Sequence, residues 1–401
     1  MLDAKTISIA VDAMEAQLVS LRRKFHEHPE LGGAEEVTSA FCQDEAKKLG
    51  LPVDMITDYA FAAVLDSGKA GKTIYMRADM DALPMKEDTV NGGGIPKPSV
   101  SKIEGMAHTC GHDAHTAILV CAMKYLVEKK DEIEGKVVFL FESGEENSGS
   151  GKEITEYLKE KGGDVIWGLH MSPDMPIGIM NCDGGTRTSG AGRIEVTFKG
   201  RGGHSSRPDK SLNPHVAAAA AITAFQSIIP LNVDPNHFAT LAICAWNGGS
   251  MPNVIPDDAV VKGGFRVYDT VDADIITASI KRISDDIAAA HGCTAEVSTK
   301  LIVVPIKNDG DLAATAVEAM GKQGIRAIKI PPIAPSESFG FYSEVIPAAF
   351  AFLGCGNAEA GVTAGNHMER FDIDEKALLL GCKISLQFVA DVMAKGGKEY
   401  V

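Results

Sequence analysis

The sequence is poor in positive charge. Lysine and arginine together number 39, against 54 aspartates and glutamates, and the formal net charge is −15. No stretch of the chain is dense enough in lysine and arginine to neutralise a phosphate backbone. We therefore expect no nucleic acid among its partners.

The sequence also lacks a long apolar segment near its start and a compact set of cysteines. Residues 1 to 31 mix acidic and basic side chains at helical spacing, unlike a signal peptide or a membrane span. The eight cysteines are scattered, and most stand in apolar surroundings. We expect a cytoplasmic protein with reduced cysteines and no membrane partner.

Internal repeats and low-complexity linkers are absent too. The chain has 401 residues, of which 45% are hydrophobic and 23% charged, a normal balance for a globular protein with a sizeable core. This length fits two or three domains. Their boundaries must be found from changes in the pattern of the sequence.

The first part of the chain predicts strands that alternate with helices. Residues 6 to 30 have helical periodicity, and three short apolar runs predict core strands: FAAVLDS, KTIYMRADM and GKVVFLFES. Between the last two runs we expect an apolar helix over residues 114 to 129. The order strand, loop, helix, strand is typical of an α/β layered domain.

From about Gly190 the pattern changes. RIEVTFKG alternates as a strand does, an alanine-rich helix follows, and FATLAICAW, DAVVKGGFRVYD, a helix near 272 to 290 and TAEVSTKLIV complete an α+β unit. Helices from Asp311 and from Asp374 then suggest a return to the first domain. We expect a domain formed by residues 1–188 and 302–401, with an α+β domain of residues 189–301 inserted into it.

The stretch AHTCGHDAHTA, residues 107 to 117, is the first candidate for a functional site. Cys110 and His112 are separated by one residue, so in a loop or extended segment both side chains can reach one point, whereas on a helix they cannot. A thiolate and an imidazole suit zinc or another divalent transition metal. Two ligands are too few, and others must come from elsewhere.

Further candidates follow apolar strands. Glu145 and Glu146 come directly after VVFLFES, His170 ends the run VIWGLH, and His367 lies in the glycine-flanked loop AGNHMERF. One glutamate can bind a metal while its neighbour accepts a proton from water. Each residue alone has an ordinary structural explanation, but the combination favours a metal site. A thiol enzyme with Cys110 as nucleophile remains an alternative.

Several motifs together resemble the two-metal amidohydrolases, a family that includes hippurate hydrolase, aminoacylase-like enzymes, indole-acetyl-amino-acid hydrolases and related carboxypeptidases. In chain order these motifs are HEHPELGGAE, RADMDALP, CGHDAH, ESGEE, GLH and GNHMERFDIDEKAL. GRGGHSSRP, NVIPD and GGFRVYD resemble the lid or dimerisation domain of that family. The resemblance implies a catalytic domain with a mixed central sheet flanked by helices, an inserted α+β lid or dimerisation domain, and a homodimer or dimer-based oligomer.

The resemblance also implies a ligand set. Cys110 would bridge two divalent ions per subunit, of zinc, manganese, cobalt or nickel, and the remaining ligands would be His112, Glu146, His170 and His367. Glu145 would be the general base and then the acid for the leaving nitrogen. Three aspartates would orient the ligands: Asp79, Asp81 and Asp113. His108 and His115 would be neighbours of the ligands and not ligands themselves.

The inserted domain would contribute to substrate binding. The resemblance implies that His204 polarises the scissile carbonyl and that Asn253 and Arg266 bind a substrate carboxylate. His204 and Asn253 would serve the active site of the partner subunit.

The function implied is that of a metal-dependent amidohydrolase that cleaves an N-acyl or N-aroyl amino acid or a similar small amide. A dipeptidase, a carboxypeptidase, an arylamine-deaminating enzyme and a catalytically inactive ligand-binding homologue are the alternatives. The chain departs from the family pattern in ESG before the acid pair, in Glu337-Ser338-Phe339, and in the insert KEDTVNGGGIPKPSVSKIEG. These departures indicate intact machinery with altered specificity.

Overall fold

The computed structural model describes residues 2–147 and 149–395, which divide into two compact units. The large unit comprises Met1–Arg187, Lys307–Pro331 and Phe341–Val401, and the small unit comprises Thr188–Ile306 and Pro332–Gly340. Residues 302–306 and 332–340, which the expected boundaries assign to the larger domain, therefore belong with the small unit. A lid or dimerisation role for the small unit stays a prediction.

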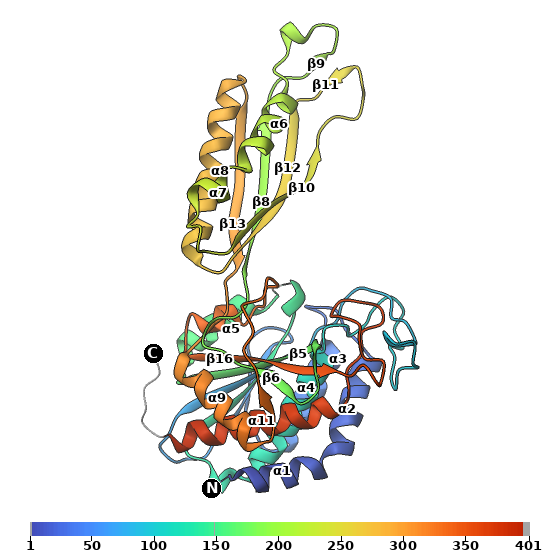
Figure 1. Ribbon diagram of the computed structural model, residues 1–401, viewed down its shortest axis with the longest axis vertical. Coiled ribbons are helices and arrows are strands. Elements are labelled where there is room, and N and C mark those ends of the chain that lie inside the picture. The colour runs from blue at the N-terminus through green and yellow to red at the C-terminus, as the bar shows by residue number, and fades with distance from the viewer. Residues whose placement is uncertain (1, 148, 396–401) are drawn as a thin grey trace. The chain divides into compact units, whose positions relative to one another are not determined.

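The large unit is built on an eight-stranded mixed sheet, shown with its helices in Figure 1. The strand order is β1-β2-β4-β3-β5-β16-β6-β15, in which β3, β4, β5 and β16 run parallel. The pairs β1–β2, β2–β4 and β16–β6 are antiparallel, and β15 pairs parallel with β6. The strands are β1 (Val53–Met55), β2 (Phe61–Asp66), β3 (Thr73–Asp79), β4 (Lys136–Glu142), β5 (Val165–Pro176), β6 (Ile179–Asn181), β15 (Arg326–Ala327) and β16 (Ala348–Gly356). The predicted α/β class and mixed sheet are confirmed.

Helices cover this sheet, with α1 and α11 on one side of it and α5 on the other (Figure 1). They are α1 (Ala4–Ala13), α2 (Glu15–Glu27), α3 (Glu36–Lys48), α4 (His112–Glu128), α5 (Gly151–Lys161), α9 (Gly310–Lys322), α10 (Gly340–Ser343) and α11 (Lys376–Ala394). By length and composition α11 could cross a membrane, but 72% of its most apolar window is buried inside the protein. Helix α11 is therefore a core helix of the large unit, and it packs against α4 and α9.

Helix α4 begins two residues before its expected start, at His112. The reason is Gly111, whose φ of 99° is left-handed and costs a glycine little, so the chain can turn sharply into the helix. His112 therefore occupies the first helical turn, while Cys110 precedes the helix. The expectation of a loop or extended segment for both residues is wrong for His112.

The small unit is a four-stranded antiparallel sheet of order β10-β12-β8-β13, with helices packed on it. Its elements are β8 (Gly190–Lys199), β9 (Gly203–His204), α6 (Pro214–Phe225), α7 (Ile228–Asn232), β10 (Ala239–Asn247), β11 (Val254–Ile255), β12 (Asp258–Val267), α8 (Thr270–Ala290) and β13 (Thr294–Val303). It has a hydrophobic core of its own, centred on Phe198, Phe225 and Phe265.

The two chain segments of the large unit that flank Thr188–Ile306 are paired with each other. Strand β7 (Gly185–Thr186) pairs antiparallel with β14 (Lys307–Asn308), and Thr186 is opposite Lys307. The base of the insertion is thus closed within the large unit.

Candidate metal centre

Six of the predicted residues come together in the large unit. They are carried by the loop before α4, the first turn of α4, a short 3-10 turn over Glu145–Asn147, strand β5 and the loop between β16 and α11. In that order the residues are Cys110, His112, Glu145, Glu146, His170 and His367. Strand β5 continues to Pro176, so His170 lies within a strand, and its expected place at a strand end is wrong.

The potential ligand atoms form two triads that share one sulfur. Cys110 lies with His112 and His170 in one triad, and with Glu146 and His367 in the other. Within each triad the donor atoms lie within 4.8 Å of one another. Each set of donors could hold one divalent transition-metal ion, because thiolate, imidazole and carboxylate ligands suit such ions.

Hydrogen bonds turn two of these imidazoles toward the sulfur. The Nδ1 of His112 lies 2.9 Å from the main-chain oxygen of Asp81, and the Nδ1 of His170 lies 2.8 Å from that of Met171. A carbonyl oxygen can only accept, so in both rings Nδ1 donates, and the Nε2 of His170 lies 3.4 Å from the Cys110 sulfur. Among the described residues the buried Nε2 of His112 has no hydrogen-bond partner.

His367 is held in an unusual backbone conformation. Its φ of 61° is the one left-handed value of a non-glycine residue in the described ranges. The N–H of His367 donates to the oxygen of Thr109 at 2.8 Å, and Asn366 donates to the oxygen of Cys110 at 3.0 Å. Its Nε2 lies 3.3 Å from the Cys110 sulfur and 3.0 Å from Glu146 Oε1. The fixed turn therefore delivers the ring to the second triad.

Glu35 supports the turn that carries the acid pair. The carboxylate is buried and accepts from the Gly144 N–H at 2.7 Å and the Ser143 hydroxyl at 2.5 Å. Burial raises the pKa of Glu35 despite these bonds. The serine of ESG, one of the departures from the family pattern, is thus the residue that donates this hydroxyl bond. Glu35 is the last residue of the motif HEHPELGGAE, but the sequence alone predicted no role for it.

Asp81 connects two of the ligands. Its Oδ1 lies 3.1 Å from His112 Nδ1, and its Oδ2 accepts from the N–H of Glu146 at 3.0 Å. One carboxylate therefore fixes an imidazole of the first triad and the backbone of a glutamate of the second.

Asp113 has a different set of contacts. It is buried and accepts from Arg22 Nε and lies 2.8 Å from His26 Nδ1, both on α2. Burial alone would raise the pKa of Asp113, but the charge of Arg22 and the hydrogen bond and charge of His26 together outweigh burial and hold that pKa well below its usual range. These contacts fasten the start of α4 to α2.

The residues present fit divalent transition metals. The donor set combines a thiol, imidazoles and a carboxylate, and the unpartnered Nε2 of His112 needs either a proton or a cation. Burial raises the pKa of the Cys110 thiol, which makes a free thiolate nucleophile unfavourable, whereas a bound cation would stabilise the thiolate directly. The donor set argues against the thiol-enzyme alternative.

Residues 75–391 match the model of one protein family, described as peptidase family M20/M25/M40. The match spans the whole ligand set, from the strand before Asp79 to the helix after His367. The chain belongs to this family. It is a metal-dependent hydrolase that acts on amide or peptide bonds.

Relatives of this M20 family member cover nearly its full length. The N-acetyl-L-cysteine deacetylase of Bacillus subtilis is 32% identical over 92% of this chain and 87% of its own. The IAA-amino acid hydrolase ILR1-like 4 of Arabidopsis thaliana is 31% identical over 92% and 83%. A solved structure, the YXEP protein of Bacillus subtilis, described as a dinuclear metal binding peptidase from the M20 family, has a TM-score of 0.82 at 27% identity and covers 96% of this chain and 99% of its own.

The predicted substrate-binding residues of this M20 family member and His204 lie in the small unit. His204 on β9 pairs with Val254 on β11, and the main-chain oxygen of Asn253 accepts from the N–H of Ser205 at 3.0 Å. Arg266 is half-buried on β12. The pairing of the short strands β9 and β11 thus brings His204 and Asn253 together. A role of His204, Asn253 and Arg266 in substrate binding stays a prediction.

Proposed function

We propose that the protein is a two-metal amidohydrolase that cleaves the amide bond of an N-acyl or N-aroyl amino acid. The observation that carries this proposal is the pair of triads that share Cys110, with Glu145 beside them in a group with His112 and Glu146. The named activities of the deacetylase and the IAA-amino acid hydrolase support this choice of substrate class.

Each residue has a part in this proposal. Divalent ions held by the two triads would lower the pKa of a water molecule and polarise the scissile carbonyl. Glu145 takes the proton of the attacking water and returns it to the leaving nitrogen. Glu146 is paired with His367 and belongs to a triad of Cys110, so it suits a metal ligand. Asp81 keeps His112 and Glu146 in place.

The substrate carboxylate and the assembly are proposed from the resemblance. His204 would polarise the carbonyl, Asn253 and Arg266 would bind the carboxylate, and the enzyme would work as a homodimer or a larger dimer-based oligomer. We further propose a cytoplasmic location, supported by eight free cysteines.

The test is a substrate panel measured with and without metal. Exhaustively demetallated protein is reloaded with manganese, zinc, cobalt or nickel and offered N-acetyl, N-benzoyl and N-indolylacetyl amino acids, dipeptides and arylamines. We expect metal-dependent release of a free amino acid from the N-acyl compounds. Full activity without metal would contradict the mechanism, and preferential dipeptide cleavage or ammonia release would favour the carboxypeptidase-type or deaminating alternative.

A further inference from the structure

His115 lies one turn beyond His112 on α4 and is buried. Its Nδ1 is 2.6 Å from Asp79 Oδ1, and its Nε2 is 2.9 Å from the main-chain nitrogen of Met171, which donates to it. Both ring nitrogens are therefore occupied by protein groups. Although its donor atoms lie close to those of Asp79 and His112, the ring has no nitrogen left for an ion.

A buried ion pair fixes which nitrogen of His115 carries the hydrogen. Arg77 donates from Nη1 to Asp79 Oδ2 at 2.7 Å and from Nε to Glu142 Oε2 at 2.6 Å, and all three side chains are buried. Asp79 is thus held as a carboxylate, which can only accept a hydrogen bond. His115 must then donate from Nδ1 and accept at Nε2, as the Met171 N–H requires.

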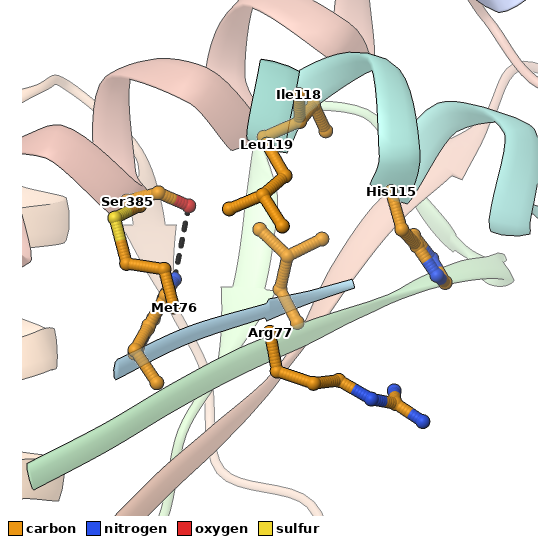
Figure 2. Close-up of a pocket in the computed structure, with 8 residues that line it drawn as sticks. Met76, Arg77, His115, Ile118, Leu119 and Ser385 are labelled. Atoms are coloured by element: carbon orange, nitrogen blue, oxygen red, sulfur yellow. Dashed lines mark hydrogen bonds between the residues drawn. The ribbon is translucent and has the colours of Figure 1, made fainter. Parts of the chain in front are cut away.

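Figure 2 shows Arg77 and His115 beside a small buried cavity of about 10 Å³. Arg77 comes from β3 and His115 from α4, and apolar side chains line most of the remaining wall. Ser385 of α11 lies at the cavity too, where it accepts from Trp167 Nε1 at 2.9 Å. His115 is buried beside this cavity, and the hydrogen bonds at both of its ring nitrogens restrain the ring from turning.

The backbone of Met171 is held from both sides. Its N–H donates to His115, and its carbonyl accepts from the Nδ1 of His170, the preceding residue. The rings of His115 and His170 are in edge contact, with centroids 4.8 Å apart. The Met171 backbone, through its N–H on one side and its carbonyl on the other, connects His115 with the ring of His170, whose Nε2 lies 3.4 Å from the Cys110 sulfur.

We propose that His115 is a positioning residue for one of the two ions, acting through the Met171 backbone on His170. This inference rests on the metal centre of the proposed function. It concerns only the triad of Cys110, His112 and His170, because no contact described above connects His115 with Glu146 or His367. Loss of the His115 acceptor should weaken one ion and spare the other.

Two substitutions at this position separate the two hydrogen bonds. In His115→Asn the amide can reach Asp79 but leaves the Met171 N–H without an acceptor, whereas in His115→Gln a longer amide can offer its oxygen to that N–H. Metal-free protein is titrated with Co²⁺ against a competing chelator, and each binding step is followed by absorption. We expect two ions in every variant, one of them bound about 10- to 100-fold more weakly in His115→Asn. His115→Gln should recover most of that loss.

Ser385→Ala is the matched control, since it removes a buried hydrogen bond at the same cavity without touching a ligand. It should change the unfolding midpoint and leave both Co²⁺ steps unchanged. Equal weakening of both ions in His115→Asn, or no weakening at all, would overturn the proposal. If His115→Asn does not fold, ¹⁵N NMR of the wild-type histidines decides, because a His115 ring protonated at Nε2 instead of Nδ1 would overturn it too.

The outcome is independent of the substrate. A protein that binds two ions with the expected pattern but cleaves no amide would contradict the proposed function and support the positioning role. Failure to bind any Co²⁺ would contradict both.

Discussion

At the scale of single residues, Glu145 and Glu146 are adjacent but occupy different places in the candidate metal centre. Glu146 lies 3.0 Å from His367, and although burial raises its pKa, the hydrogen bond from His367 and the charge of His112 outweigh burial and lower it. Glu146 thus stays a carboxylate and suits a ligand. Glu145 is half-buried and stands in the same group as His112 without belonging to either triad of Cys110.

The first prediction follows from this difference. Glu145→Gln should keep both ions and lose turnover about 10²- to 10⁴-fold, because an amide cannot carry the proton. Glu146→Gln should instead lose metal. Metal content is measured beside the rate for each variant. Loss of metal in Glu145→Gln with retention in Glu146→Gln would mean that the two roles are exchanged.

The second prediction concerns the shared sulfur. Cys110→Ser should bind both ions more weakly, by about tenfold or more, because an alcohol is a poorer bridge than a thiolate. The control is Cys244→Ser, an exposed cysteine of β10 in the small unit, which should leave metal content unchanged. Unchanged metal content in Cys110→Ser would remove this residue from the ligand set.

At the scale of elements, the insert of residues 86–105 fastens the loop that carries His367. The N–H of Asp88 and the buried ammonium of Lys97 both donate to the carbonyl of Glu369, and Asp88 also accepts from Arg370 at 2.9 Å. Lys97 is in turn bound by Glu87, which lies 2.8 Å from His26 on α2. The unusual insert thus supports a ligand loop.

The third prediction concerns Glu87 and the pH dependence of the stability that its carboxylate provides. Burial raises the pKa of Glu87, but hydrogen bonds from His26 and Lys97 outweigh it and lower the pKa to about 2. A carboxyl group whose pKa is lower in the folded state stabilises that state at pH values above its unfolded pKa of 4.5. This stabilisation is lost as the pH falls from 4.5 through 2. Near pH 7, Glu87→Gln should lower the free energy of unfolding by about 3 kcal/mol.

Urea unfolding of wild type and variant at a series of pH values checks this. The difference between the two proteins should shrink steadily below pH 4.5. A difference that is constant with pH would show that the carboxylate charge of Glu87 is not the source of the stabilisation.

Elements with a strong local pattern could be predicted from the sequence. The run TAEVSTKLIV coincides with β13, and the three apolar runs of the first part coincide with β2, β3 and β4 within a residue or two. The extension of β5 through His170 could not be predicted, because its partner β16 is far away in sequence. Helices α3 and α5 were not predicted either, since they are largely polar and few of their residues are buried.

The candidate site divides in the same way. Its five predicted ligands could be identified from the sequence, because cysteine, histidine and glutamate are typical metal-binding residues and stand in motifs of the family. The roles of Glu35 and His115 could not be predicted, because they depend on which groups lie beside each side chain after folding. Neither contact has a local signal, since Glu35 and Gly144 are 109 residues apart and His115 and Met171 are 56 apart.

At the scale of the whole molecule, each unit has a hydrophobic core of its own. All five predicted ligands lie in the large unit, and the pairing of Thr186 with Lys307 closes the base of the insertion. The large unit should therefore fold and bind metal by itself.

The fourth prediction removes the small unit. Residues 188–306 are replaced by Asn-Gly, which favours a tight turn between antiparallel strands, and residues 332–340 by a glycine and serine linker of equal length. We expect cooperative unfolding and binding of both ions, with loss of hydrolysis if His204, Asn253 and Arg266 hold the substrate. A shortened protein that does not bind metal would show that the centre depends on the small unit.

The sharing of Cys110 between the triads has a consequence for the protein during its synthesis. Its sulfur is 60 residues from His170 in one triad but 257 residues from His367 in the other. The adjacent strands β1 to β5 all precede the insertion, so a chain growing from its N-terminus can gather the first triad long before the last histidine leaves the ribosome. We expect the centre to be loaded in two stages, with the order set by time of emergence and not by affinity. A nascent chain would hold one ion before His367, a ligand of the second triad, has been synthesised.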